Sequence, residues 1–188
     1  MKRALLAVVV VAALLLPASA LARVGTGRAP AGAVANYRAP VAATPLFQLT
    51  EKEQLVISLI NKQRAKHGLH AVRANLSLVE AARDHSAEMV GKQYFSHESY
   101  SGESFWQRLI RYGYKRSGYT SWTVGEDIAW GQGLLGTPQA IVDAWMHSAP
   151  HRQVILTPKF RDCGVGVASG SYKSGAFLFT LDMGQRRK

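Results

Sequence analysis

The stretch WMHSAPHRQVILTPKFRDCGVGVASG, residues 145–170, contains the change from helical to strand-like patterning that decides the fold. Before it, Thr137-Pro138 is typical of a helix start, and apolar residues follow at helical spacing. Pro150 disfavours helical geometry at the preceding residue, so this helix should end near Ser148. Val154 to Leu156 then has room only for a short further turn before the strand-like run begins.

The C-terminal part of the chain predicts paired strands. CGVGVASG (163–170) and AFLFTLDMG (176–184) flank a turn-forming segment at 171–175, a pattern typical of a hairpin. The segment GEDIAW (125–130) is expected to supply a third strand or its edge.

Three helices are predicted upstream of these strands. Thr50 and Glu53 form a capping box at the start of the first, and Gly68 supplies its left-handed stop. The second helix is expected to open at Ser77, and the third runs from Ser104 to about Tyr112. Helices first and strands later predict an α+β layered domain rather than a doubly wound parallel sheet.

The N-terminus has the pattern of an export signal. Two basic residues precede an apolar run, and Ala18-Ser19-Ala20 offers a cleavage site, with a second site after Ala22. We therefore predict a signal peptide over 1–20, a flexible Ala/Pro/Gly-rich linker over 21–48 and one domain over 49–188. The protein is expected to be secreted, either to the extracellular space or to the periplasm.

Charge and cysteine content restrict the possible partners. Two of the 23 Lys and Arg residues lie in the signal segment. The rest of the chain therefore has 21 basic and 12 acidic residues, which gives it a net charge of +9. A basic surface can attract anionic envelope polymers or lipid head groups, or it can serve only to keep the protein soluble. One basic cluster in the sequence consists of Arg108, Arg111, Lys115 and Arg116. No nucleic-acid motif occurs, and we expect a monomer without nucleic-acid partners. Cys163 is the only cysteine, so no intramolecular disulfide can form.

Three residues in separate segments are candidates for chemistry: His97, Glu126 and His151. Two imidazoles and a carboxylate can bind a divalent metal, exchange protons or hold each other in a polar cleft, and each residue alone can equally be a packed or capping group. His85 fits a core or cleft-edge position, and His67 and His70 lie near a helix stop and should be exposed. Signatures of zinc proteases, serine hydrolases and nucleotide-binding loops do not occur.

The motifs FSH (95–97), GEDIA (125–129), WMHSAPHR (145–152) and CGVGVA (163–168) together resemble the CAP superfamily (SCP/PR-1), in its bacterial secreted branch. The resemblance implies a three-layer α-β-α sandwich and a cleft with two His and two Glu. By motif, three of these four carry over to the candidate residues named above. Ser148 stands where the second Glu is usual, and Asp127 stands where Asn is usual.

The resemblance leaves several functions open. It implies a cleft of His97, Glu126, Ser148 and His151 that binds a small polar ligand or a divalent metal, possible zinc ligands being His97 and His151. On this view the protein is not a conventional enzyme. Two alternatives remain: a metal-dependent peptidase or cell-wall hydrolase with Glu126 as general base, and a module that binds lipid or envelope polymers through its basic surface.

Overall fold

The computed structural model describes residues 47–188. The predicted signal peptide (1–20) and all of the predicted linker (21–48) except its last two residues lie outside the described part. Within residues 47–188, no helix is long and apolar enough to cross a membrane.

Four strands form one sheet in the order β1-β3-β4-β2. Their bounds are β1 (Arg73–Ala74), β2 (Ser121–Gly131), β3 (Asp162–Ser169) and β4 (Phe177–Arg187). The two C-terminal strands pair antiparallel, as the hairpin pattern predicted, and β2 pairs antiparallel with β4 along its whole length. The two-residue β1, which is parallel to β3, was not predicted because it is too short to show a pattern.

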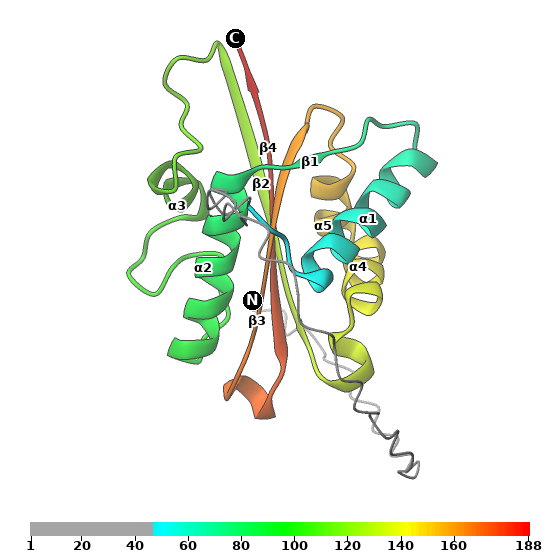
Figure 1. Ribbon diagram of the computed structural model, residues 1–188, viewed down its shortest axis with the longest axis vertical. Coiled ribbons are helices and arrows are strands. Elements are labelled where there is room, and N and C mark those ends of the chain that lie inside the picture. The colour runs from blue at the N-terminus through cyan, green and yellow to red at the C-terminus, as the bar shows by residue number, and fades with distance from the viewer. Residues whose placement is uncertain (1–46) are drawn as a thin grey trace, which may run out of the picture. The chain divides into compact units, whose positions relative to one another are not determined.

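Helices cover both faces of the sheet and complete an α-β-α sandwich, as predicted (Figure 1). The helices are α1 (Glu51–Lys66), α2 (Leu76–Lys92), α3 (Phe105–Arg111), α4 (Pro138–His147) and α5 (Ala149–Ile155), with short 3₁₀ turns at η1 (Gly133–Gly136) and η2 (Tyr172–Ser174). In Figure 1, α2 and α3 lie on one side of the strands, and α1, α4 and α5 lie on the other.

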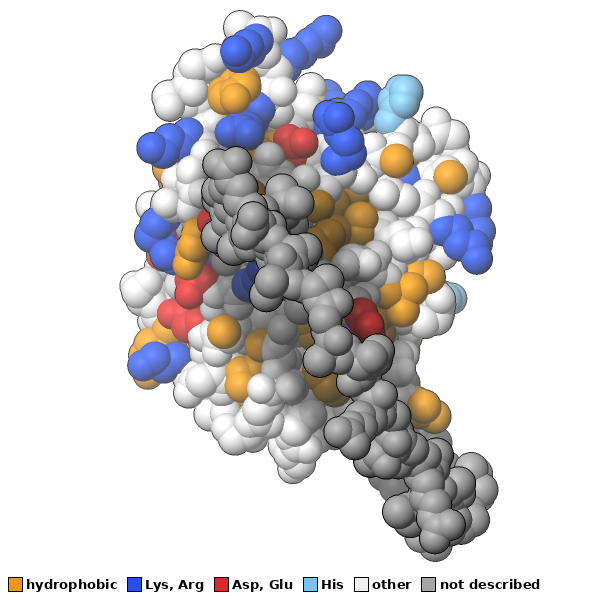
Figure 2. All heavy atoms as spheres, viewed as in Figure 1, with side chains coloured by type: hydrophobic (Ala, Val, Ile, Leu, Met, Phe, Trp, Pro, Cys, Tyr) orange, Lys and Arg blue, Asp and Glu red, His pale blue; other side chains and the backbone are white. Residues whose placement is uncertain are grey.

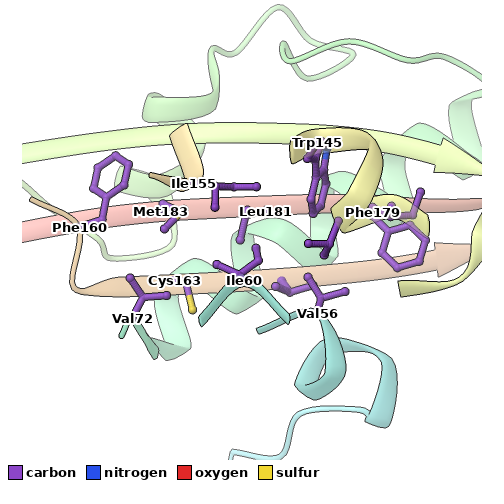
Figure 3. Close-up of a cluster of buried hydrophobic side chains, with 13 residues drawn as sticks. Val56, Ile60, Val72, Trp145, Ile155, Phe160, Cys163, Phe179, Leu181 and Met183 are labelled. Atoms are coloured by element: carbon purple, nitrogen blue, oxygen red, sulfur yellow. The ribbon is translucent and has the colours of Figure 1, made fainter. Parts of the chain in front are cut away.

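The main hydrophobic core lies between the sheet and the layer of α1, α4 and α5. Trp145 and Ile155 point from the helices toward Phe179 and Leu181 on β4 (Figure 3). Cys163 lies in the same cluster and is fully buried. Because no disulfide joins the layers, this packing has to supply the stability that cross-links provide in many secreted domains.

On the opposite face of the sheet, α2 packs closely on β3. A Cβ atom added at Gly164 would lie 2.1 Å from the backbone of Leu78, and one at Gly166 would lie 2.2 Å from that of Ala82. Only glycine permits such an approach of backbone to backbone. The two glycines therefore fix the distance of α2 from the sheet, and with it the position of the loop that follows α2.

Two helix boundaries differ from the sequence-based expectation. Helix α2 begins at Leu76 with Asn75 as its N-cap, because the Asn75 side chain accepts a hydrogen bond from the amide of Ser77. The prediction of Ser77 as the cap was therefore wrong. After Ser148 the chain starts a new helix, α5, in which Pro150 occupies the first turn, where its missing N–H costs no hydrogen bond. The short turn expected at residues 154–156 is the end of this helix.

Candidate functional site

The first candidate histidine, His97, lies in the loop between α2 and α3. Helix α2 ends at Gln93, whose left-handed backbone (φ 57°, ψ 42°) turns the chain back toward the sheet. The ring of His97 then reaches the carboxylate of Glu126, and its Nδ1 lies 2.8 Å from Oε1. The side chain of His97 is 50% exposed and that of Glu126 only 1%, so the acid lies beneath the imidazole and the ring faces solvent.

Glu126 lies on β2, on the face of the sheet that α2 and α3 cover. Its second carboxylate oxygen accepts a hydrogen bond from Nη2 of Arg108, a fully buried residue of α3. The same guanidinium donates to Ser99 Oγ at 2.8 Å and, through longer contacts, to the carbonyl oxygen of His97. Arg108 thus holds both the acid and the loop that carries the first histidine.

Sequence reasoning assigned Arg108 to a basic surface cluster, and that assignment was wrong. The residue is 0% exposed, whereas Arg111, one helical turn later, makes ion pairs at the surface. The i, i+3 spacing of Arg108 from the apolar Phe105 could have indicated an inward position. An arginine on an inward face is a sign of a buried carboxylate partner, because an unpaired buried charge is costly.

The second histidine, His151, comes from the other helical layer. It belongs to the first turn of α5, and its Nδ1 lies 2.7 Å from the hydroxyl of Ser148, which caps the same helix. Gly125 permits α5 to pack closely on β2, since a Cβ there would lie 3.1 Å from Val154. Burial lowers the pKa of His151, and the charge of a protonated His97 lowers it further. The two imidazoles therefore lie within electrostatic range of each other.

All four predicted site residues are thus present in two contacting pairs. His97 contacts Glu126, and His151 contacts Ser148, the residue that stands in place of a second acid. In both pairs the Nδ1 atom has an oxygen partner, and neither Nε2 atom has a hydrogen-bond partner within residues 47–188.

Two further acids next to Glu126 were not identified from the sequence as part of the site. Asp182 is the register partner of Glu126 on β4 and is completely buried. Burial, and then the charge of Glu126, raises the pKa of Asp182 well above its usual range. Asp127 points to the opposite face, where burial and then Glu126 raise its pKa to about 8. Of these three acids, only Glu126 has a guanidinium partner among the described residues.

His67, His70 and His85 lie where the sequence indicated. His85 is buried in α2, and its Nε2 donates to the carbonyl oxygen of Ser96 at 2.8 Å. Burial and the nearby charge of Arg108 lower its pKa, so the ring is neutral at pH 7. His67 and His70 are exposed after the end of α1. None of the three is part of the cleft.

The side chains near His97 and His151 limit the number of ligands that a metal site could have. Within residues 47–188, no three His, Cys, Asp or Glu side chains converge on one point as ligands. Glu126 is not available as a third ligand, because His97 and Arg108 occupy its two oxygens. The donors left for a metal are the Nε2 atoms of His97 and His151, which have no hydrogen-bond partner among residues 47–188.

Comparisons with known proteins bear on this geometry. The family model described as "CAP: Cysteine-rich secretory protein family" matches residues 57–183. The chain belongs to the CAP family. This CAP domain is 39% identical over 127 residues to YkwD of Bacillus subtilis and 33% identical over 119 residues to YlbC, described as a membrane protein, of the same organism. These alignments cover 67% and 63% of the chain but only 46% and 32% of the relatives, so the chain spans less than half of their length.

Solved structures show the same fold. An extracellular protein of Bacillus anthracis with an SCP domain matches the CAP domain with a TM-score of 0.57 at 25% identity, covering 76% of this chain and 45% of that one. An outer surface protein of Borrelia burgdorferi matches with a TM-score of 0.58 at 18% identity, covering 71% of this chain and 92% of that one. These structural similarities and the family match confirm the three-layer sandwich. They also confirm the resemblance to the CAP superfamily from which this fold was predicted.

Proposed function

We propose that the cleft binds a divalent metal ion, with zinc as the first candidate, or a small polar ligand, and that the protein is not a conventional enzyme. The observation that carries the proposal is the pairing of each ring's Nδ1 with an oxygen, Glu126 Oε1 for His97 and Ser148 Oγ for His151. The Glu126 carboxylate can only accept, so it fixes the His97 tautomer that presents the Nε2 lone pair outward, as in metal-binding histidines. The Ser148 hydroxyl can accept from His151 Nδ1 in the same way.

The geometry assigns an orienting role to Glu126. A carboxylate that accepts from an imidazole N–H makes the other nitrogen a better ligand. A bound zinc ion supplies Lewis acidity and fixes the position of ligand oxygen atoms. In this chain His97 and His151 would hold the ion, while Glu126 and Ser148 would orient the two rings and Arg108 holds Glu126 in place.

The same contacts count against the hydrolase alternative. A general base has to reach the proton that it removes, and Glu126 is buried with both oxygens occupied by donors. In the position usual for a second acid, Ser148 provides a hydroxyl that is not basic at neutral pH. The arrangement therefore supports binding better than proton transfer.

Zinc uptake by the full chain tests this proposal. Calorimetry at pH 7.5 should show one zinc ion bound by the wild type and a loss of at least 10-fold in affinity in the variant His97→Ala/His151→Ala. The matched control, His67→Ala/His70→Ala, removes two exposed imidazoles outside the cleft and should bind like the wild type. No uptake by the wild type, or equal losses in both variants, rules out the cleft as a metal site.

The pH dependence of zinc binding follows from the state of the rings. A protonated imidazole cannot ligate, so binding should weaken as the pH falls through about 6.5, the ordinary pKa of histidine. Because the pKa of His151 is lowered, this ring should become protonated, and stop binding zinc, only at a pH below that ordinary value. Titrations at pH 7.5, 6.5 and 5.5 should show the affinity fall stepwise, and an affinity that is unchanged at pH 5.5 contradicts imidazole ligation.

We also propose that the protein is exported and works as a monomer outside the cytoplasm. The N-terminal pattern of a basic pair, an apolar run and small residues supports this, as does the description of the Bacillus anthracis neighbour as extracellular. Mass spectrometry of the protein from culture medium should give an N-terminus after Ala20 or Ala22. An intact Met1 on the secreted chain contradicts the proposal.

A further inference from the structure

A second concave site lies beyond the C-terminal end of α5. Helix α5 ends at Ile155, but β2 and β4 continue past it and leave the same face of the sheet uncovered. The hollow there has a volume of about 630 Å³, and its walls come from three segments: the start of β2, the end of β4 and the turn between α5 and β3. It is lined by Ser121, Thr123, Pro158, Lys159, Arg161, Gln185 and Arg187.

The lining of this hollow is basic and contains no acid. Lys159, Arg161 and Arg187 bring three positive charges, and none of them forms an ion pair with a carboxylate within residues 47–188. Asp162, next in the chain, points to the opposite face, where it accepts a hydrogen bond from Tyr114. In Figure 2, blue Lys and Arg side chains gather at the end of the molecule where the C-terminus of β4 lies.

A buried cation near the hollow adds to this charge. Arg64 is fully buried in α1 and forms no salt bridge within the described residues. Its guanidinium donates only to backbone carbonyl oxygens, those of His70, Ile155, Thr157 and Phe160. The guanidinium groups of Arg64 and Arg161 lie close together, because both donate to the carbonyl oxygen of Phe160. Burial lowers the pKa of Arg64, and the charge of Arg161 is the next cause. The chain thus keeps two like charges side by side with no carboxylate to balance them.

The side chain of Arg161 is held in place by the backbone of the turn. Its Nη1 donates to the carbonyl oxygens of Pro158, Lys159 and Phe160, which anchors the guanidinium in the turn. Within residues 47–188, its Nη2 and Nε have no hydrogen-bond partner. A fixed guanidinium with free donors binds an oxyanion with less loss of side-chain entropy than a free arginine.

We propose that this hollow binds the phosphate group of an anionic polymer or lipid. The residues that line it carry hydrogen-bond donors: three cationic groups, the hydroxyls of Ser121 and Thr123, and the amide of Gln185. A tetrahedral phosphate offers acceptor oxygens in several directions, whereas a carboxylate offers two in one plane. Since Lys159 and Arg187 are exposed, binding weakens steeply with salt.

Titration with inorganic tripolyphosphate at low salt tests the proposal on the full chain. The variant Lys159→Gln/Arg187→Gln removes two exposed charges of the hollow and should raise the Kd at least 10-fold, with an unchanged melting temperature. The control Lys62→Gln/Lys92→Gln removes two charges from α1 and α2, which do not line the hollow, and should raise it less than 3-fold. Equal losses in the two variants, or equal affinity for citrate, overturn the proposal and leave a general basic surface.

Vesicles identify the source of the phosphate. Binding to phosphatidylglycerol vesicles that is lost in Lys159→Gln/Arg187→Gln and displaced by tripolyphosphate supports a lipid head group. Binding of tripolyphosphate with no binding to such vesicles supports a soluble phosphate polymer. Both readouts are independent of His97 and His151, so the His97→Ala/His151→Ala variant should behave like the wild type in each. Failure of this proposal is therefore distinguishable from failure of the metal site.

Discussion

Asp127 places a carboxyl group where water hardly reaches it. The residue is 1% exposed, and its Oδ2 has no hydrogen-bond partner in the described part of the chain. Burial, and then the charge of Glu126, raises its pKa from 3.8 to about 8. Between these two pH values the folded protein holds a proton that the unfolded chain has lost, so the free energy of unfolding falls as the pH rises from about 4 to about 8.

Replacement of Asp127 by Asn should remove this pH dependence. The amide has nearly the same shape and no charge to desolvate, so Asp127→Asn should raise the free energy of unfolding at pH 8 by on the order of 1–3 kcal/mol. At pH 3, where the carboxyl is mostly protonated in both the folded and the unfolded chain, the gain should nearly vanish. Urea denaturation at the two pH values measures it, with Asp84→Asn at a half-exposed position as the control. An equal effect at both pH values would show that packing, not ionisation, is responsible.

The pair Arg108–Glu126 gives the largest expected cost of a single substitution in the site. Glu126→Gln leaves a fully buried guanidinium without a counter-charge, which should lower the free energy of unfolding by about 3–5 kcal/mol. Arg111→Gln is the matched control, because it breaks ion pairs of a 49% exposed arginine on the same helix and should cost less than about 1 kcal/mol. Chemical denaturation of both variants tests the contrast, and similar costs would contradict a buried ion pair.

At the scale of elements, the contact between α2 and β3 depends on two glycines. Gly166→Ala should destabilise the fold by about 3 kcal/mol or more, because its Cβ would lie 2.2 Å from the backbone of Ala82 and neither element can move freely. Gly91→Ala, in α2 itself, has nothing within 4 Å of the added atom and should stabilise the helix by about 0.5–1 kcal/mol. Thermal melts of the two variants should shift in opposite directions.

Local signals in the sequence predicted most of the elements. Helix-start residues located the beginnings of α1 and α4, and two strand-like runs around a turn-forming segment located the C-terminal hairpin, since both signals depend only on near neighbours. Helix α5 was missed because Pro150, which ends one helix, also fits the first turn of the next. Strand β1 was missed because its two residues depend entirely on their pairing with β3.

The site was predictable only in part, and for a similar reason. Motifs brought His97, Glu126 and His151 to attention, and the structure places His97 against Glu126. The spacing of Arg108 from Phe105 indicates at most an inward position, and which acid Arg108 pairs with depends on how α3 packs on β2. The place of Asp182 beside Glu126 depends on the register of β4 with β2, which no local pattern shows. Charged residues are usually exposed, so a prediction from composition places Arg108 at the surface by default.

At the scale of the whole molecule, the fold is independent of thiol chemistry. Burial raises the pKa of Cys163 to about 12, and the residue is 0% exposed in the main core. The native protein should therefore react with a thiol reagent only as fast as it unfolds, and a reducing agent should leave its melting temperature unchanged. Labelling kinetics in increasing urea measure this; fast labelling without denaturant would contradict a buried thiol.

The origin of the two histidines has a further consequence. His97 extends from the layer of α2 and α3, and His151 extends from the layer of α4 and α5. The sheet lies between these two helical layers (Figure 1). A ligand bound by both rings would link the two helical layers. That link would have to break before either layer could separate from the strands. Occupancy of the cleft should then slow the opening of the two layers together, and amide exchange in α2 and α5 should report it although the two helices lie on opposite sides of the sheet.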